Sequence, residues 1–170
     1  MKGIKKCCFS GHRPQRLPWG NRESGFAFEK CYVDLENAII EAIYDGYTHF
    51  ISGVALGIDM VSAEIVLKLK QQFDIKLECA IPCLGQSEIW GAKAKARYQN
   101  IIENADFVTC VSHTPYYDGC MEERNQYMVE NSSRLIAVYS GRLGGGGTKK
   151  TIEYAKSKGL EVVIIEPICQ

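Results

Sequence analysis

Short apolar runs alternate with helical patterns along the whole chain, and this alternation limits the possible folds more than any other feature of the sequence. Strands are predicted at residues 4–9, 48–52, 76–81, 106–111, 135–139 and 160–165, and helices at residues 26–45, 58–73, 87–104, 120–131 and from residue 148 onward. Largely apolar strands joined by helices imply a parallel sheet covered on both faces, with right-handed crossovers. The sequence therefore predicts the α/β class: a single Rossmann-like three-layer α/β/α domain over residues 1–170, with a mostly parallel sheet of about six strands.

Composition excludes several classes of function. A hydrophobic content of 46% and a charged content of 24% indicate a globular chain. The formal net charge of +0 argues against a protein whose main role is to coat nucleic acid. No apolar run approaches the roughly 18 residues of a membrane span. No signal-peptide pattern is present, so we expect a cytoplasmic protein with no membrane partner.

The eight cysteines do not form a recognisable metal site. They include no CxxC pair and match no common zinc spacing. We expect buried, reduced thiols and no bound metal.

A glycine-rich junction follows the fifth predicted strand. Four consecutive glycines, Gly144 to Gly147, precede a helix that is expected to begin with Thr148 as its N-cap. Glycines let the backbone approach a ligand closely, and a helix start offers free N–H groups and a partial positive charge. Lys149 and Lys150 follow, where the helix dipole disfavours cations, and a bound anion would remove that conflict. The junction favours a phosphate site, and the alternative is a flexible surface loop before an ordinary helix.

The loops after the first, second, fourth and fifth strands are expected to meet at one edge of the sheet. In open α/β sheets, ligands bind outside the carboxyl ends of the strands, near the point where the strand order reverses. The candidate ligand-binding residues on these loops are Ser10, Gly11, His12, Arg13, Ser52, Gly53, Gly57, Asp59, Gly145, Gly146, Gly147 and Thr148.

Two polar residues interrupt the apolar stripe of the helix predicted at residues 120–131. The stripe contains Met121, Met128 and Val129, and Arg124 and Asn125 fall within it. A buried guanidinium without a partner is very costly, so Arg124 must meet a carboxylate, a phosphate or water. The sequence leaves two interpretations: a salt bridge to an Asp or Glu, or a contact with a phosphate or sugar.

Four other residues each have a structural and a functional interpretation. His12 is either a satisfied loop histidine or a phosphate donor or acid, and Arg13 is either an exposed loop arginine or a ligand contact. Asp59 either caps its helix or forms a hydrogen bond with a ribose hydroxyl. Trp90 either packs in the core beside Tyr98 or stacks on a base. No GxSxG, Walker A or GxGxxG motif is present, and no catalytic residue is assigned.

The motifs resemble those of two related protein families. Residues 52–64, SGVALGIDMVSAE, resemble the SGxAxGID segment of the Smf/DprA DNA-processing proteins. Residues 121–148 resemble the MHxRKxxM…ALPGGxGT segment of the LOG phosphoribohydrolases. Both families belong to the SLOG superfamily, which is Rossmann-like and binds nucleotides or nucleotide derivatives. The SGHRP segment, the run from Gln86 through Trp90 to Arg97 and Tyr98, and the RNxxM segment are most similar to the YpsA-like branch.

The resemblance implies binding more than catalysis. Arg124 matches the LOG active-site arginine, and Gly146, Gly147 and Thr148 match the phosphate-binding GxGT. LOG enzymes carry a glutamate two or three positions after that threonine, where this chain has Lys150 and Thr151. We therefore expect a regulatory or sensing domain that binds a nucleotide or nucleotide-derived ligand with a phosphate group, without an obligatory cofactor.

Two other functions stay open at this point. One is a phosphoribohydrolase that cleaves the N-glycosidic bond of nucleoside monophosphates with Glu122, Glu123 or Asp59 as a substitute acid. The other is single-stranded nucleic-acid binding as in Smf/DprA, although nucleic acid is the less favoured partner. A homodimer is also compatible with the sequence.

Overall fold

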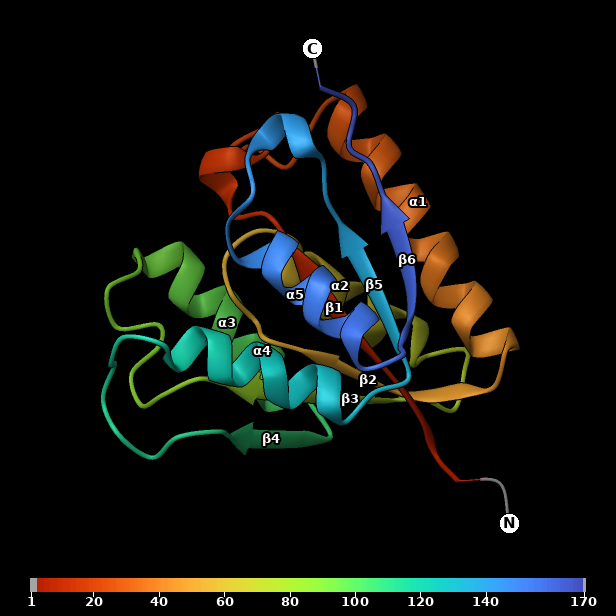
Figure 1. Ribbon diagram of the computed structural model, residues 1–170. Coiled ribbons are helices and arrows are strands. Elements are labelled where there is room, and N and C mark those ends of the chain that lie inside the picture. Colours follow the sequence, from red (N-terminus) through yellow and green to blue (C-terminus); the bar gives the residue numbers. More distant parts are fainter. Residues whose placement is uncertain (1–2, 170) are drawn as a thin grey trace.

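Six parallel strands form one sheet in the computed structural model, which describes residues 3–169 (Figure 1). The strands are β1 (Lys5–Gly11), β2 (Tyr47–Ser52), β3 (Lys76–Ile81), β4 (Phe107–Cys110), β5 (Arg134–Val138) and β6 (Glu161–Ile165). Their order across the sheet is β4-β3-β2-β1-β5-β6, and every neighbouring pair is parallel. The predicted α/β class and parallel sheet are confirmed.

Helices cover both faces of this sheet. The helices are α1 (Phe26–Tyr44), α2 (Ile58–Leu69), α3 (Ala92–Asn104), α4 (Cys120–Glu130) and α5 (Gly146–Ser157), with short 3₁₀ turns η1 (Pro14–Arg16) and η2 (Gly141–Leu143). The chain steps outward from β1 to β4 and then returns to place β5 on the other side of β1. Because crossovers are right-handed, this reversal puts α1, α2 and α3 on one face and α4 and α5 on the other (Figure 1).

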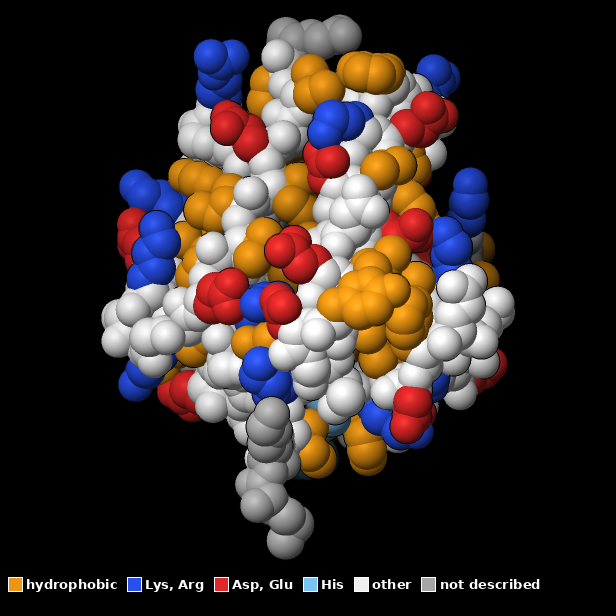
Figure 2. Space-filling model, turned by 90° about the vertical axis from the view of Figure 1, so that its right-hand side faces the viewer, with side chains coloured by type: hydrophobic (Ala, Val, Ile, Leu, Met, Phe, Trp, Pro, Cys, Tyr) orange, Lys and Arg blue, Asp and Glu red, His pale blue; other side chains and the backbone are white. Residues whose placement is uncertain are grey.

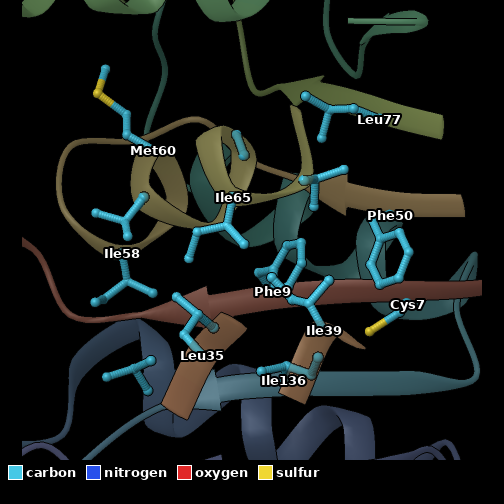
Figure 3. Close-up of a cluster of buried hydrophobic side chains, with 14 of the residues drawn as sticks. Cys7, Phe9, Leu35, Ile39, Phe50, Ile58, Met60, Ile65, Leu77 and Ile136 are labelled. Atoms are coloured by element: carbon cyan, nitrogen blue, oxygen red, sulfur yellow. The ribbon is translucent and has the colours of Figure 1, made fainter. Parts of the chain in front are cut away.

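Alternating side chains of the central strands fill two hydrophobic layers. Phe9, Phe50 and Ile136 point toward α1 and α2, where they meet residues such as Leu35 and Ile65 (Figure 3). The intervening residues, including Cys8, Ile51 and Leu135, pack under α4 and α5. Both layers are rich in branched apolar side chains, which is the pattern expected of strands covered on both faces.

The cysteines are free thiols, and most of them lie inside these layers. Cys7, Cys8, Cys31, Cys79, Cys83 and Cys120 are buried, and Cys110 and Cys169 are partly exposed. Burial raises the pKa of the Cys8, Cys31 and Cys79 thiols to about 12, which keeps them protonated.

Three predicted helix boundaries are wrong. The third helix begins at Ala92, because residues 82–91 form turns in which Gly85 has a φ of +75°. The second helix ends at Leu69, and turns replace the predicted last residues. The fifth helix begins at Gly146 with Gly145 in the N-cap position, so Thr148 lies inside the first turn and does not cap the helix. A run of four glycines carries no side-chain signal for where a helix starts.

The reversal of strand order lies between β1 and β5. The chain leaves the carboxyl end of β1 toward α1 and β2, and it leaves β5 toward α5 and β6 on the opposite side. The two connections diverge, which opens a space at that edge of the sheet. Within residues 3–169, no helix is both long enough and apolar enough to cross a membrane.

Candidate functional site

A cavity of about 240 Å³ lies at the carboxyl ends of β1 and β5. Its lining residues are Ser10, Gly11, His12, Arg13, Arg16, Asp59, Met121, Arg124, Asn125, Gly145, Gly146, Gly147 and Thr148. The structure thus brings together predicted site residues from β1, α2, α4 and the start of α5. Arg16 and Met121 also line the cavity, although neither was among the predicted site residues.

Two glycines allow the loops after β1 and β2 to pack tightly under the cavity. A Cβ on Gly11 would lie 2.4 Å from Cβ of Ile58. Gly57 has a φ of +96°, and a Cβ there would lie 2.7 Å from the backbone oxygen of His12. Only glycine fits either position without a shift of the surrounding chain. Gly57 therefore shapes the cavity from behind and does not line it.

Ser52 also acts from behind the cavity wall. Its hydroxyl donates to the backbone oxygen of Asp59 at 2.7 Å and accepts from the N–H of Val54 at 3.1 Å. These bonds tie the end of β2 to the first turn of α2. Ser52 and Gly53, which were predicted to bind the ligand, do not line the cavity, whereas Asp59 of α2 does.

Arg124 is the largest polar side chain in the interior, with 2% of its surface exposed. Its Nη1 donates to the backbone oxygens of Gly53 at 2.8 Å and Ala80 at 3.3 Å, and its Nε donates to Oδ1 of Asn125 at 2.9 Å. Gly53 makes room for this arrangement, since a Cβ there would lie 2.6 Å from Cζ of Arg124. The guanidinium therefore rests on the carboxyl ends of β2 and β3.

The charge of Arg124 has no contact partner of opposite sign. Within the described residues, no carboxylate oxygen lies within 4.0 Å of the guanidinium, so the salt-bridge interpretation is wrong. Nη2 reaches only the sulfur of Met121, at 3.7 Å. Burial lowers the pKa of Arg124 and the charge of Asp59 raises it, but an arginine stays charged under both influences. A buried cation with an open edge thus faces the cavity.

Asp59 is the carboxylate of the cavity lining. Burial raises the pKa of Asp59 above its usual range, while the charges of Arg124 and Arg13 and the backbone N–H of Ala55 act in the opposite direction. A carboxyl group with a raised pKa can donate a proton or a hydrogen bond at a higher pH than a free aspartate.

His12 holds the loop after β5. It is 3% exposed, its Nε2 accepts from the N–H of Ser140 at 3.3 Å, and its ring stacks on Tyr139 at 5.5 Å. Burial and the charge of Arg16 lower the pKa of His12. The ring is therefore neutral at pH 7, with its proton on Nδ1, and the geometry favours the structural interpretation of this residue over an acid.

The start of α5 presents unpaired backbone N–H groups to the cavity. No side chain caps this helix, and in the described part of the chain the N–H groups of Gly146, Gly147 and Thr148 have no protein acceptor. Arg13 and Arg16 also line the cavity, and Nη2 of Arg13 makes only a 3.9 Å contact with the sulfur of Met121. Three arginines and a helix N-terminus thus face one aspartate, which gives the cavity a net positive potential.

Trp90 is not brought to the cavity. It is partly buried, packs edge-to-face on Tyr98 with ring centroids 5.5 Å apart, and contacts the layer under α1 and α2. The core-packing interpretation is confirmed for this residue. The helix boundary at Ala92 explains the difference, because Trp90 lies in the preceding turn and not on a helix that points to the sheet edge.

A second hollow, the α4–α5 groove, opens from the cavity and was not predicted. It has a volume of about 610 Å³. It is lined by Gly119, Met121, Glu122, Asn125, Gln126, Gly146, Gly147, Lys150, Thr151, Glu153, Tyr154 and Ser157. Met121, Asn125, Gly146 and Gly147 line both hollows. The sequence contained no direct signal for the groove, because its width depends on how far apart α4 and α5 pack.

The lining residues do not suggest a metal centre. Across residues 3–169, no group of three or more His, Cys, Asp or Glu side chains is placed to hold a metal ion. The chemistry of the cavity is that of hydrogen-bond donors and positive charge at a strand-order reversal. The fold and site together define a Rossmann-like α/β domain with a cavity rich in arginine at the carboxyl edge of its sheet.

A family model described as the YspA SLOG family (YpsA) matches residues 7–167, and the chain belongs to this family. The predicted SLOG resemblance and its YpsA-like branch are confirmed.

Curated relatives carry the family designation UPF0398. A protein of Macrococcus caseolyticus is 29% identical over 139 residues, which cover 80% of this chain and 74% of that protein. One of Halalkalibacterium halodurans is 33% identical over 61% of this chain and 56% of that protein. One of Staphylococcus epidermidis is 37% identical over 49% of this chain and 46% of that protein, so this match spans about half of each.

Two solved structures of DNA processing protein A share the fold. The Streptococcus pneumoniae protein has a TM-score of 0.64 and 19% identity, over 95% of this chain and 50% of that chain. The Helicobacter pylori protein has a TM-score of 0.58 and 16% identity, over 94% of this chain and 64% of that chain. The latter structure concerns the single-stranded DNA binding mode of that protein. At these identities the likeness shows the fold alone.

Proposed function

We propose that the cavity binds the phosphate group of a nucleotide or nucleotide-derived ligand, and that the domain serves a regulatory or sensing role. One observation carries the proposal: the buried guanidinium of Arg124 has an open edge and no carboxylate contact beside the uncapped start of α5. A helix N-terminus with free N–H groups is a ready anion site, and an arginine supplies charged hydrogen bonds to phosphate oxygens.

The electrostatic balance of the cavity also supports an anionic ligand. Burying a cation costs several kcal/mol by order of magnitude, and a nearby anion offsets that cost. Asp59 makes no contact with Arg124, and burial raises the pKa of its carboxyl group. A carboxyl group with a raised pKa takes up a proton at a higher pH, and its protonated form repels a phosphate less than the carboxylate does.

Binding is tested first on the cavity arginines. Arg13→Ala and Arg124→Ala are compared with the wild type by calorimetry against nucleotides, cyclic and linear dinucleotides, and ADP-ribose derivatives. Loss of a charged hydrogen bond weakens binding by about 1.5–3 kcal/mol, or roughly 10- to 150-fold. Arg124 also supports the fold, so Arg13→Ala is the variant that keeps the test valid if Arg124→Ala unfolds.

The matched control is Arg22→Ala, because Arg22 is exposed and lies away from the cavity. Unchanged affinity in a folded Arg13 or Arg124 variant would remove that arginine from the site. No binding of any phosphate compound to a folded wild-type sample would refute the proposed function.

A second candidate function is hydrolysis of an N-glycosidic bond, and Asp59 is the observation that favours it. Asp59 carries the carboxyl group among the described residues that line the cavity. The raised pKa of this group is favourable for a general acid. Glu123 is bonded to the hydroxyl of Tyr117 and does not line the cavity, whereas Glu122 lines the α4–α5 groove. Release of free base from nucleoside monophosphates, lost in Asp59→Asn, would establish this activity.

Single-stranded DNA binding is the outcome to exclude, because the fold is shared with DNA processing protein A. The formal net charge of this chain is +0, and acidic and basic side chains are interspersed on the side that carries α1 and β6 (Figure 2). A mobility shift that weakens steeply with salt would favour nucleic acid over a small ligand. The expected homodimer stays a prediction, which light scattering tests.

A further inference from the structure

The size of the cavity limits which part of a ligand it can hold. Sites that enclose a small organic molecule have volumes of about 300–1,000 Å³, and the cavity has about 240 Å³. It therefore accommodates a phosphate group but not a whole nucleotide. The rest of the ligand needs an adjoining space.

The α4–α5 groove is the adjoining space. Its volume of about 610 Å³ lies in the range for an organic ligand, and it shares Met121, Asn125, Gly146 and Gly147 with the cavity. A third hollow of about 830 Å³, between residues 14–24 and helices α2 and α3, shares no lining residue with the cavity. The groove is thus the continuation that a phosphate in the cavity can reach.

The two helices that form the groove run side by side on one face of the sheet (Figure 1). Tyr154 of α5 donates its hydroxyl to Glu130 of α4, which bridges the helices away from the cavity. The ring of Tyr154 packs against the core layer and lines the groove. This ring offers an apolar surface, and Gln126 and Lys150 offer hydrogen-bond donors.

Gly147 lies where the groove joins the cavity, and the fold does not require a glycine there. It is inside α5, its φ is ordinary, and apart from its chain neighbours and the nearby backbone of α5 a Cβ would meet no atom within 4 Å. Glycine within a helix is less favourable than alanine, so the position costs stability without a packing or backbone reason. The missing side chain instead leaves clear the path between the two hollows.

We infer that the ligand is a nucleoside phosphate that crosses Gly147, with its phosphate in the cavity and its nucleoside in the α4–α5 groove. The inference rests on the proposed phosphate site and adds the place of the organic part. Lys150 and Gln126 would then meet sugar or base oxygens, Glu122 and Glu153 would accept from hydroxyl or amino groups, and Tyr154 would contact the base.

Calorimetry on the purified full chain tests the path across Gly147. The probes are AMP, GMP, CMP, UMP, ribose 5-phosphate and inorganic phosphate. We expect at least one nucleoside monophosphate to bind tenfold or more tightly than ribose 5-phosphate. We also expect Gly147→Ala to unfold at the wild-type temperature or above it while binding that nucleotide at least tenfold more weakly.

The control for this variant is Gly91→Ala, another glycine at a helix start where a Cβ meets nothing within 4 Å. It lies outside both the cavity and the groove, so its affinity should be that of the wild type. Wild-type affinity in Gly147→Ala would overturn the inference.

Variants of two adjacent lysines distinguish direct contact with the groove from a general effect of positive charge on binding. Lys150 lines the groove and Lys149 lines neither hollow, although both are exposed on α5. We expect Lys150→Ala to weaken the nucleotide fivefold or more without changing the affinity for inorganic phosphate, and Lys149→Ala to change either affinity less than twofold.

Equal losses in the two lysine variants would overturn the groove assignment. Equal binding of ribose 5-phosphate and every nucleoside monophosphate would do the same while leaving the phosphate site intact. If neither phosphate nor any nucleotide binds, the proposed function fails together with the inference.

Discussion

Replacing Gly53 by alanine should destabilise the fold through Arg124. A Cβ on Gly53 would lie 2.6 Å from both Cζ and Nη1 of Arg124 and 2.9 Å from Nε. Carbon contacts become favourable only at about 3.5 Å, so the guanidinium would have to move by roughly 1 Å. It is held by bonds of 2.8 Å to Gly53 and 2.9 Å to Asn125, which such a movement would stretch or break.

The expected loss follows from opposing contributions. Overpacking costs about 1–3 kcal/mol, and each weakened bond from a charged donor forfeits part of about 1.5–3 kcal/mol. A glycine-to-alanine change returns about 0.4–1 kcal/mol by restricting the unfolded chain. The net expectation is a loss of about 2 kcal/mol, which lowers the melting temperature by about 4–8 °C for a chain of this size.

Urea unfolding of four proteins measures the effect: wild type, Gly53→Ala, Arg124→Ala and the double variant. Once the guanidinium is removed, the added methyl group has space, so Gly53→Ala should cost almost nothing in the Arg124→Ala background. The coupling energy should therefore be about 2 kcal/mol. Additive losses of stability, or a Gly53→Ala protein as stable as the wild type, would refute the idea that Gly53 is needed to make room for the side chain of Arg124.

Three further predictions concern stability. Burial would raise the pKa of Glu78, but hydrogen bonds from His49 and Tyr127 lower it below its usual value of 4.5, so this carboxylate stabilises the fold at neutral pH and loses that effect as the pH falls. Glu78→Gln should therefore be less stable than the wild type at pH 7, with a difference that shrinks below pH 4.5 in acid-unfolding curves. Tyr127→Phe should cost about 1 kcal/mol in urea, and no cost would show that its bond to Glu78 is unimportant. Gly11→Ala should lose about 3 kcal/mol, because its Cβ would lie 2.4–2.7 Å from three atoms of Ile58, and Ile58→Ala should relieve that loss.

The sequence predicted the sheet because its signals are local and repeated. Apolar strands and amphipathic helices alternate, and handedness rules then place the loops after β1, β2 and β5 at one edge. The position of Arg124 within an apolar stripe correctly predicted its burial. The hydrogen-bond acceptors of Arg124 could not be predicted, because they are backbone oxygens at the ends of β2 and β3. These oxygens belong to Gly53 and Ala80.

The errors and omissions have equally physical causes. Trp90 was placed on a helix because apolar residues at residues 87–104 recur at helical spacing, but the turns around Gly85 delay the helix to Ala92. Arg16 reaches the cavity only because η1 folds it under the glycine loop, where its Nη1 would lie 2.5 Å from a Cβ on Gly144. Such proximity depends on tertiary packing that no local pattern encodes.

The pairing of β1 with β5 has a consequence for synthesis on the ribosome. Cys7 lies beside Arg134, so more than a hundred further residues must be synthesised before one edge of β1 has its neighbouring strand. Until then β1 can pair with β2 on one side only, and non-local pairing such as that of β1 with β5 is slow to form. The cavity needs both β1 and the start of α5, so it is completed among the last parts of the domain. A nascent or truncated form that ends before β5 would therefore lack the glycine-rich wall of the cavity.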